Sequence, residues 1–274
     1  MKLIVICNPG CGKQKLSKHK DLIVSTLSEK HDVTYVESKS LEDLKALVSD
    51  ASKEYECIVI CGGDGTFHHC MNSLRDFKGY LGYIPAGTSC DMGKNLNTSK
   101  NVKKALKVIL DGTTKKRKSM HINDLKVSYV LASGKFVATS YQTGRKLKKL
   151  GKFVYLFKCI PEIFRRYKLN VKIDGTPYRA KIVCILNSRC VFGCTFRHCD
   201  NEVLIIRKHP LLTMARILLT KKVKTTKWMD VISLDGKKLE FDFDTWSVDG
   251  EKMILPKEFE CNGVYEEFDF IVGK

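Results

Sequence analysis

The segment Gly62-Gly63-Asp64-Gly65-Thr66 has the residue types of a phosphate-binding turn, and it directly follows the apolar run 57–61. Glycines let backbone N–H groups approach phosphate oxygens, and the N-terminus of a following helix adds a favourable dipole. A carboxylate among them can hold a phosphate-bound Mg²⁺. A tight strand-to-helix turn would explain the glycines but not the Asp and Thr, so we favour a phosphate site over a purely structural turn.

Two more turns of this kind follow predicted strands. Asn8-Pro9-Gly10-Cys11-Gly12-Lys13 comes after the apolar run 3–7, and Pro85-Ala86-Gly87-Thr88-Ser89-Cys90-Asp91 comes after the run 81–85. The first is too short for a Walker A loop. In a parallel sheet, ligands bind beyond the carboxyl ends of the strands, where these turns would converge. Together they predict a nucleotide-binding cradle.

A third kind of candidate, Asp249-Gly250-Glu251, carries two carboxylates on a predicted hairpin turn. As local sequence it indicates only a turn.

Four soft ligands at Cys190, Cys194, His198 and Cys199 could hold Zn²⁺, but their spacing is not that of a paired knuckle. We therefore interpret them as core and loop side chains rather than a zinc site.

The elements that position these residues change character along the chain. Up to about residue 118, strands and helices alternate, which predicts an α/β domain with a mainly parallel sheet. From residue 119 on, short strands separated by turn dipeptides predict a mainly antiparallel, β-sandwich-like domain. We predict domains 1–118 and 119–274 with a cleft between them, and a C-terminal tail that can pack back onto the first. The expected strands are 3–7, 33–36, 57–61, 81–85, 125–131, 136–140, 169–173, 180–186, 203–206, 231–234, 239–243 and 253–255, and the expected helices are 15–29, 41–52, 102–110 and 146–166.

Composition limits the classes of function. The 274 residues are 43% hydrophobic and 28% charged, which excludes a disordered chain. The 48 basic against 30 acidic side chains give a formal charge of +18, which favours an anionic partner: nucleic acid, a membrane face or a phosphorylated molecule. No nucleic-acid recognition motif is present, so no nucleic-acid partner is expected. The basic, aromatic helix 146–166 leaves two uses open, an anionic membrane face or core packing.

Cellular location is also an expectation from sequence. No run approaches the roughly 18 apolar residues of a spanning helix, and Met1-Lys2 leads directly into a stretch too short for a signal peptide. The 12 cysteines lie mostly in apolar runs and are expected to be reduced, buried thiols. We expect a cytoplasmic protein.

Taken together, the motifs resemble the diacylglycerol kinase catalytic-domain family of lipid kinases, which includes sphingosine and ceramide kinases. The resemblance rests on the three turns, on 150–155 (Leu-Gly-Lys-Phe-Val-Tyr) and on Asp249-Gly250-Glu251, and its order and spacing extend over nearly the whole chain. It implies an ATP- and Mg²⁺-dependent kinase, peripherally associated with the membrane, that phosphorylates a hydroxyl of diacylglycerol or a similar lipid. NAD kinases share the Gly-Gly-Asp-Gly-Thr motif but match the later segments less well.

The resemblance also implies roles for individual residues. Glu251 would act as general base on the lipid hydroxyl, with Asp249 supporting it. Asp64 would hold the catalytic Mg²⁺, and Asp200 would help to hold a structural Mg²⁺. The residues expected to line the nucleotide site are Asn8, Pro9, Gly10, Cys11, Gly12, Ser38, Gly62, Gly63, Gly65, Thr66, Gly87 and Thr88.

The chain departs from the family pattern at a few positions. His68-His69 stands where relatives usually carry Asn-Glu, Cys90 where they carry Asn, and Asn201 follows Asp200 where they carry Gly. Two alternatives therefore stay open: a kinase for a soluble hydroxylated acceptor, and a nucleotide- or membrane-binding relative that has lost turnover. The acceptor and the oligomeric state, including a homodimer, are not determined by the sequence.

Overall fold

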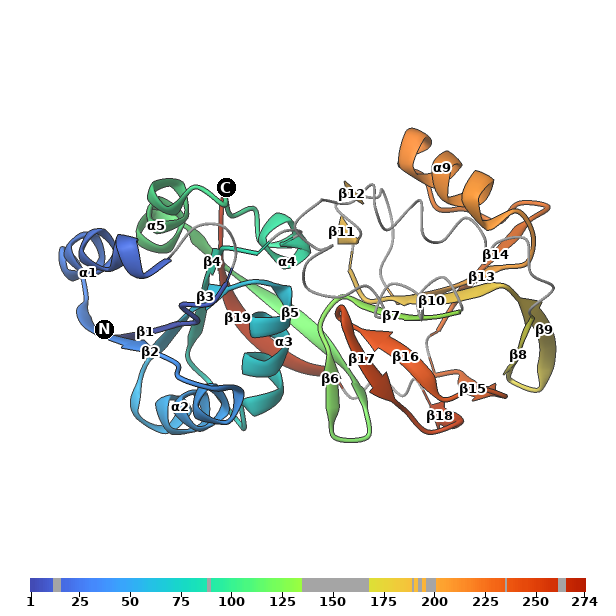
Figure 1. Ribbon diagram of the computed structural model, residues 1–274, viewed down its shortest axis with the longest axis horizontal. Helices are drawn as coiled ribbons and strands as arrows, with labels where there is room; N and C mark the ends of the chain where they lie inside the picture. The colour runs from blue at the N-terminus through green and yellow to red at the C-terminus, as the bar shows by residue number, and fades with distance from the viewer. Residues whose placement is uncertain are drawn as a thin grey trace. The chain divides into compact units, whose positions relative to one another are not determined.

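The computed structural model describes residues 1–11, 16–87, 90–134, 168–188, 190–191, 194–195, 201–234, 236–260 and 265–274 (Figure 1). The chain divides into two compact units. Unit 1 comprises Met1–Ser119 and Tyr265–Lys274, and unit 2 comprises Met120–Val264. The predicted strand 136–140 and helix 146–166 lie outside the described residues, as do Gly12, Thr88, His198, Cys199 and Asp200.

Unit 1 is built on a mainly parallel sheet, in the order β2-β1-β3-β4-β19-β5. Strands β1, β3 and β4 are almost wholly buried because helices cover both faces, which is why their sequences are continuous apolar runs rather than alternating ones. Strand β5 continues into unit 2, where it forms a hairpin with β6. The strands are β1 (Lys2–Cys7), β2 (Asp32–Glu37), β3 (Cys57–Gly62), β4 (Tyr80–Pro85), β5 (Thr113–Ile122) and β19 (Tyr265–Val272).

The helices of unit 1 form two layers (Figure 1). Helices α1 and α5 cover one face, where Ile23, Leu27 and Ile109 pack against side chains of β1 and β3. Helices α2 and α3 contact each other and the sheet from the other side. The bounds are η1 (Leu16–His19, a 3₁₀ turn), α1 (Lys20–Ser28), α2 (Leu41–Glu54), α3 (Asp64–Ser73), α4 (Asp91–Asn95) and α5 (Val102–Asp111).

Caps explain where two of these helices begin. The Ser40 hydroxyl accepts the N–H of Asp43 at 3.1 Å at the start of α2, and the Asn101 side chain accepts the N–H of Lys104 at 3.2 Å at the start of α5. The single helix predicted for 15–29 is wrong in its first turn, which is 3₁₀. The side chain of His19 makes no capping hydrogen bond at the point where α1 begins.

The last strand completes the sheet of unit 1. Strand β19 pairs in parallel with β4, with Asp269 opposite Tyr80, and the order of the sheet puts β5 on its other side. Its Phe270 is 3% exposed and stacks on Phe67 of α3, with ring centroids 5.9 Å apart. The final residues of the chain are therefore part of the core of unit 1.

Unit 2 contains two larger antiparallel sheets, of order β14-β13-β10-β7-β16-β17 and β18-β15-β8-β9. Trp246 of the first packs on Phe241 and Phe259 of the second, with ring centroids 4.8 and 6.0 Å apart. The predicted fold class, a parallel α/β domain followed by an antiparallel β domain, is confirmed. The strands are β6 (Leu125–Val127), β7 (Val130–Ser133), β8 (Leu169–Ile173), β9 (Thr176–Ala180), β10 (Ile182–Leu186), β11 (Cys190–Val191), β12 (Cys194–Thr195), β13 (Glu202–Ile206), β14 (Met229–Ser233), β15 (Lys238–Phe241), β16 (Thr245–Val248), β17 (Glu251–Ile254) and β18 (Glu258–Glu260).

Unit 2 also contains a helix that the sequence analysis missed, α9 (Pro210–Thr220). The expectation that one helix alone interrupts the strands after residue 119 is therefore wrong. Two signals were present: Pro210 at the first helical position, and Thr213 and Ile217 one turn apart, both of which are buried. No helix in the described part of the chain is long and apolar enough to cross a membrane.

Because β19 contributes core side chains to unit 1, we predict that Phe270→Ala lowers the free energy of unfolding by about 3–5 kcal/mol. The matched control is Tyr80→Ala on the paired strand, where the ring is 42% exposed, and it should cost roughly 1 kcal/mol or less. Urea unfolding of the full chain measures both. Equal, small effects would show that β19 does not stabilise unit 1.

Candidate functional site

The ends of three adjacent strands bring three turns together at one edge of the unit 1 sheet. Strand β3 lies between β1 and β4, and the register pairs Cys7 with Cys61 and Gly62 with Pro85. The turns that follow, which begin at Asn8, Gly63 and Ala86, therefore leave the sheet side by side. This confirms the convergence expected from a parallel sheet.

Side chains connect the first turn to the second. The Asn8 amide donates to the Thr66 hydroxyl at 3.0 Å, and its carbonyl accepts the N–H of Gly10 at 3.1 Å. The Cys11 thiol lies 3.2 Å from the same hydroxyl and accepts the N–H of Gly63, also at 3.2 Å. Asn8 and Cys11 thus fix the first turn against the start of α3.

Glycine is required where the second and third turns meet. A Cβ on Gly87 would lie 2.7 Å from the Cα of Gly63, and one on Gly62 would lie 2.5 Å from the Cβ of Thr66. Side chains cannot occupy these positions without moving the backbone. Beneath them the buried Tyr83 hydroxyl donates to the carbonyl of Gly62 at 3.0 Å. Tyr83 was not predicted, although it carries the single hydroxyl in the apolar run 81–85.

Asp64 connects the second turn to the third. Its carboxylate accepts the N–H of Cys90 at 2.7 Å and of Met92 at 3.4 Å, at the start of α4. Burial, and secondarily the neighbouring carboxylate of Asp91, raises the pKa of Asp64 to about 6. The third turn therefore holds a carboxylate that is costly to ionise.

The N-terminus of α3 is suited to bind an anion. Its N-cap is Gly63, which has no side chain to satisfy the first N–H groups of the helix. Those N–H groups and the helix dipole attract phosphate oxygens. The histidines that follow lie further along the helix: His68 is 1% exposed, and His69 is half-buried, with a pKa lowered chiefly by that burial.

Ser38 lies at the same sheet edge, directly after β2. Its N–H and its hydroxyl both donate to the carbonyl of Cys7, at 2.9 and 3.4 Å, and the residue is buried. The hydroxyl is therefore directed at the backbone. No described contact joins Ser38 to the three turns.

In unit 2, Asp249 and Glu251 lie on the hairpin between β16 and β17. Asp249 and Gly250 have φ of +50° and +94°, as a tight hairpin turn requires. The fully buried Asp249 carboxylate accepts the N–H groups of Ser128, Tyr129 and Val130 at 2.8, 2.9 and 3.1 Å. Glu251 begins β17 opposite Val248 and is half-buried. Asp249 thus secures the hairpin that carries Glu251.

The predicted metal ligands can be compared with this geometry. Among the described residues no three His, Cys, Asp or Glu side chains form a metal-binding group. A phosphate-bound Mg²⁺ needs only one or two protein carboxylates, and Asp64 with the nearby Asp91 supplies that number. These residues fit such an ion.

The predicted site residues therefore fall into four groups, one of which is Ser38 alone, hydrogen-bonded to the backbone of Cys7. Unit 1 brings together Asn8, Pro9, Gly10, Cys11, Gly62, Gly63, Asp64, Gly65, Thr66 and Gly87. Asp249 and Glu251 lie in unit 2, and Gly12, Thr88 and Asp200 lie outside the described residues. The backbone N–H groups of Cys90 and Met92, which hold Asp64, were not predicted.

Known proteins resemble this chain in sequence and in fold. The sequence model of the diacylglycerol kinase catalytic domain matches residues 2–122. A diacylglycerol kinase of Staphylococcus carnosus is 28% identical over 193 residues, which cover 66% of this chain and 62% of that protein. One from Staphylococcus aureus is 26% identical over 185 residues, covering 65% and 58%. The chain thus spans about three fifths of the length of these relatives.

A solved structure shows the same fold. The crystal structure of a Bacillus anthracis protein assigned as a diacylglycerol kinase superposes with a TM-score of 0.83 at 20% identity, covering 99% of this chain and 97% of that chain. All three turns of the candidate site fall within the matched residues 2–122. In that segment, the chain is similar in sequence to the diacylglycerol kinase catalytic domain.

Proposed function

We propose that this protein is an ATP-dependent lipid kinase, which transfers the γ-phosphoryl group of ATP to a hydroxyl of diacylglycerol or a similar lipid. The observation that carries the proposal is the joining of three glycine-containing turns at the uncapped N-terminus of α3. Backbone N–H groups held this rigidly suit a polyphosphate. The similarity of residues 2–122 to the diacylglycerol kinase catalytic domain supports this reaction class.

In this proposal the phosphates of ATP bind at the turns of Asn8, Gly63 and Gly87. Asp64, with Asp91 beside it, holds the phosphate-bound Mg²⁺. The ion, when bound, neutralises charge on the phosphate oxygens. The N–H of Gly63 donates to the sulfur of Cys11. A phosphate oxygen bound here would replace that sulfur as the acceptor of the Gly63 N–H.

Glu251 is the proposed general base. A lipid hydroxyl has a pKa far above neutrality, so it attacks phosphorus more readily when an acceptor takes its proton. Asp249 has a positioning role, because its carboxylate is occupied by backbone N–H groups. The proposal requires Glu251 to reach the phosphates bound by unit 1. The acceptor would be met at the cytoplasmic membrane face, which the charge of +18 favours.

A second candidate is a nucleotide-binding relative without turnover. It is favoured by Asp64, whose carboxylate is already engaged by two N–H groups and whose pKa is raised. Both properties oppose metal binding.

Incubation of the protein with γ-labelled ATP, Mg²⁺ and vesicles containing diacylglycerol tests the proposal. We expect label in the chloroform phase, and we expect Glu251→Gln to reduce transfer by about 10²-fold or more while ATP affinity is unchanged, because only the proton acceptor is lost. Label confined to water-soluble products would identify a soluble acceptor instead. Nucleotide binding without transfer would favour the second candidate.

Asp249→Asn should affect stability rather than chemistry alone. An amide oxygen cannot accept all three N–H groups, so we predict a loss of about 2–4 kcal/mol in the free energy of unfolding. The exposed Asp244→Asn, at the other end of β16, is the control and should change stability by roughly 0.5 kcal/mol or less. If Asp249→Asn unfolds at the wild-type urea concentration, the carboxylate does not hold the hairpin.

The raised pKa of Asp64 predicts a pH dependence of nucleotide binding. Mg²⁺ binds the ionised carboxylate, and with a pKa of about 6 that form is lost as pH falls from 7 to 5. The affinity for Mg²⁺-ATP, measured by calorimetry, should fall about 10-fold over that range. Affinity for ATP without Mg²⁺ should change less, and Asp64→Asn should remove the difference. A Mg²⁺ dependence that persists unchanged in Asp64→Asn would exclude Asp64 as ligand.

A further inference from the structure

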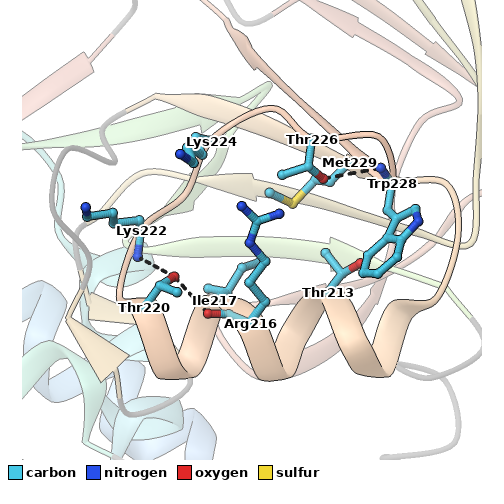
Figure 2. A pocket seen from close by; sticks show the side chains of 9 residues that line it. All are labelled: Thr213, Arg216, Ile217, Thr220, Lys222, Lys224, Thr226, Trp228 and Met229. Atoms are coloured by element: carbon cyan, nitrogen blue, oxygen red, sulfur yellow. Dashed lines mark hydrogen bonds between the residues drawn. The ribbon is translucent and has the colours of Figure 1, made fainter.

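Unit 2 contains a cavity of about 380 Å³ between α9 and the segment that follows it (Figure 2). Its floor is apolar, because Ile217 and Met229 are buried there, and Trp228 forms one wall. The ring centroid of His209 lies 5.1 Å from that of Trp228, and the Nζ of Lys227 also lies 5.1 Å from the centroid of the Trp228 ring. The cavity is therefore a built feature of the fold, lined by Thr213, Arg216, Ile217, Thr220, Lys222, Lys224, Thr226, Trp228 and Met229.

Three cationic residues line this cavity. Arg216 points into it from α9, and Lys222 and Lys224 come from the chain beyond the helix (Figure 2). None of the three forms an ion pair within the described part of the chain, whereas Arg207 nearby pairs with Asp230 at 3.0 Å. Cationic side chains without an ion-pair partner, placed around an apolar floor, attract a negatively charged group.

An apolar ridge lies beside the cavity on the same helix. Leu212 is 56% exposed and Leu219 is 85% exposed, seven residues apart and so on one face of α9. Arg216 lies between them in sequence, four residues after Leu212 and three before Leu219, and is itself exposed. Large exposed leucines flanking a cation are typical of a helix that lies at a membrane interface.

We propose that α9 and residues 221–229 bind the surface of an anionic phospholipid bilayer, with a headgroup phosphate in the cavity and Leu212 and Leu219 in the acyl layer. A soluble phosphate would satisfy the cations but leave the leucines in water. A bilayer satisfies both, because its phosphates lie directly above its hydrocarbon. The net charge of +18 favours the same surface. This docking surface belongs to unit 2, whereas the nucleotide cradle belongs to unit 1, and its binding to a bilayer requires no ATP.

The charge arm of the test uses flotation of the full chain with phosphatidylcholine vesicles, with and without an equal part of phosphatidylglycerol. The double variant Arg216→Gln/Lys224→Gln should bind the anionic vesicles about 30-fold more weakly than wild type. The matched control, Lys103→Gln/Lys107→Gln, removes two exposed charges from α5 and should weaken binding by less than about threefold. Equal losses in the two double variants would indicate bulk charge alone and overturn the proposal.

The apolar arm uses Leu212→Gln/Leu219→Gln, which should weaken binding to anionic vesicles by at least about 10-fold. Its control is Ile254→Thr, which removes an exposed apolar side chain from β17 and should leave binding unchanged. If the leucine variant binds the anionic vesicles with wild-type affinity, the proposal is overturned. If inorganic phosphate binds the wild-type protein and blocks vesicle binding over the same range of phosphate concentration, the cavity is a site for a soluble anion. That result also overturns the proposal.

Two further measurements keep the outcomes separate. Circular dichroism and thermal unfolding establish that each variant is folded. Transfer to diacylglycerol in detergent micelles should be the same in wild type and in the α9 variants. Absence of transfer in all of them would count against the proposed kinase function, while the vesicle data would still decide whether α9 binds the bilayer.

Discussion

The close contact between the backbones of Gly63 and Gly87 is the constraint on which the candidate site depends. With 2.7 Å between the Cα of one and the position of a Cβ on the other, the two turns approach as only glycine permits. Asp64, which follows Gly63, can then accept the N–H of Cys90 at the start of α4. A side chain at Gly87 would separate the second and third turns and so weaken the hydrogen bonds from α4 to Asp64.

The position of Asp64 in this arrangement has an electrostatic cost. Asp64 is held by backbone N–H groups, which favour the carboxylate, yet burial and Asp91 raise its pKa to about 6. Burial and the charge of Asp91 therefore raise the pKa of Asp64 by more than the hydrogen bonds lower it. A raised carboxyl pKa means that stability falls as pH rises through the interval between the unfolded and folded pKa values. A cation bound beside Asp64 would favour the ionised carboxylate and so lower its pKa.

The parts predicted from sequence are those determined by local pattern. Continuous apolar runs identified β1, β3 and β4, and a parallel sheet then required Asn8, Gly63 and Gly87 to share an edge. The role of Asp249 could not be predicted this way, since its partners lie about 120 residues earlier in the chain. Helix α9 was missed because its exposed leucines obscure the amphipathic period: Leu212 and Leu219 face away from the core that Thr213 and Ile217 enter.

Chain connectivity links the stability of the two units. Unit 1 is completed by β19, which pairs Asp269 with Tyr80, so the whole of unit 2 is inserted between β5 and the strand that finishes the sheet. Closing a flexible loop of that length carries an entropic cost that grows with the logarithm of its length, by about 0.6 kcal/mol per doubling. If unit 2 folds first, the flexible part of the loop is shorter and β19 docks at lower cost. Destabilising unit 2, even far from the nucleotide cradle, therefore weakens the sheet that carries the cradle.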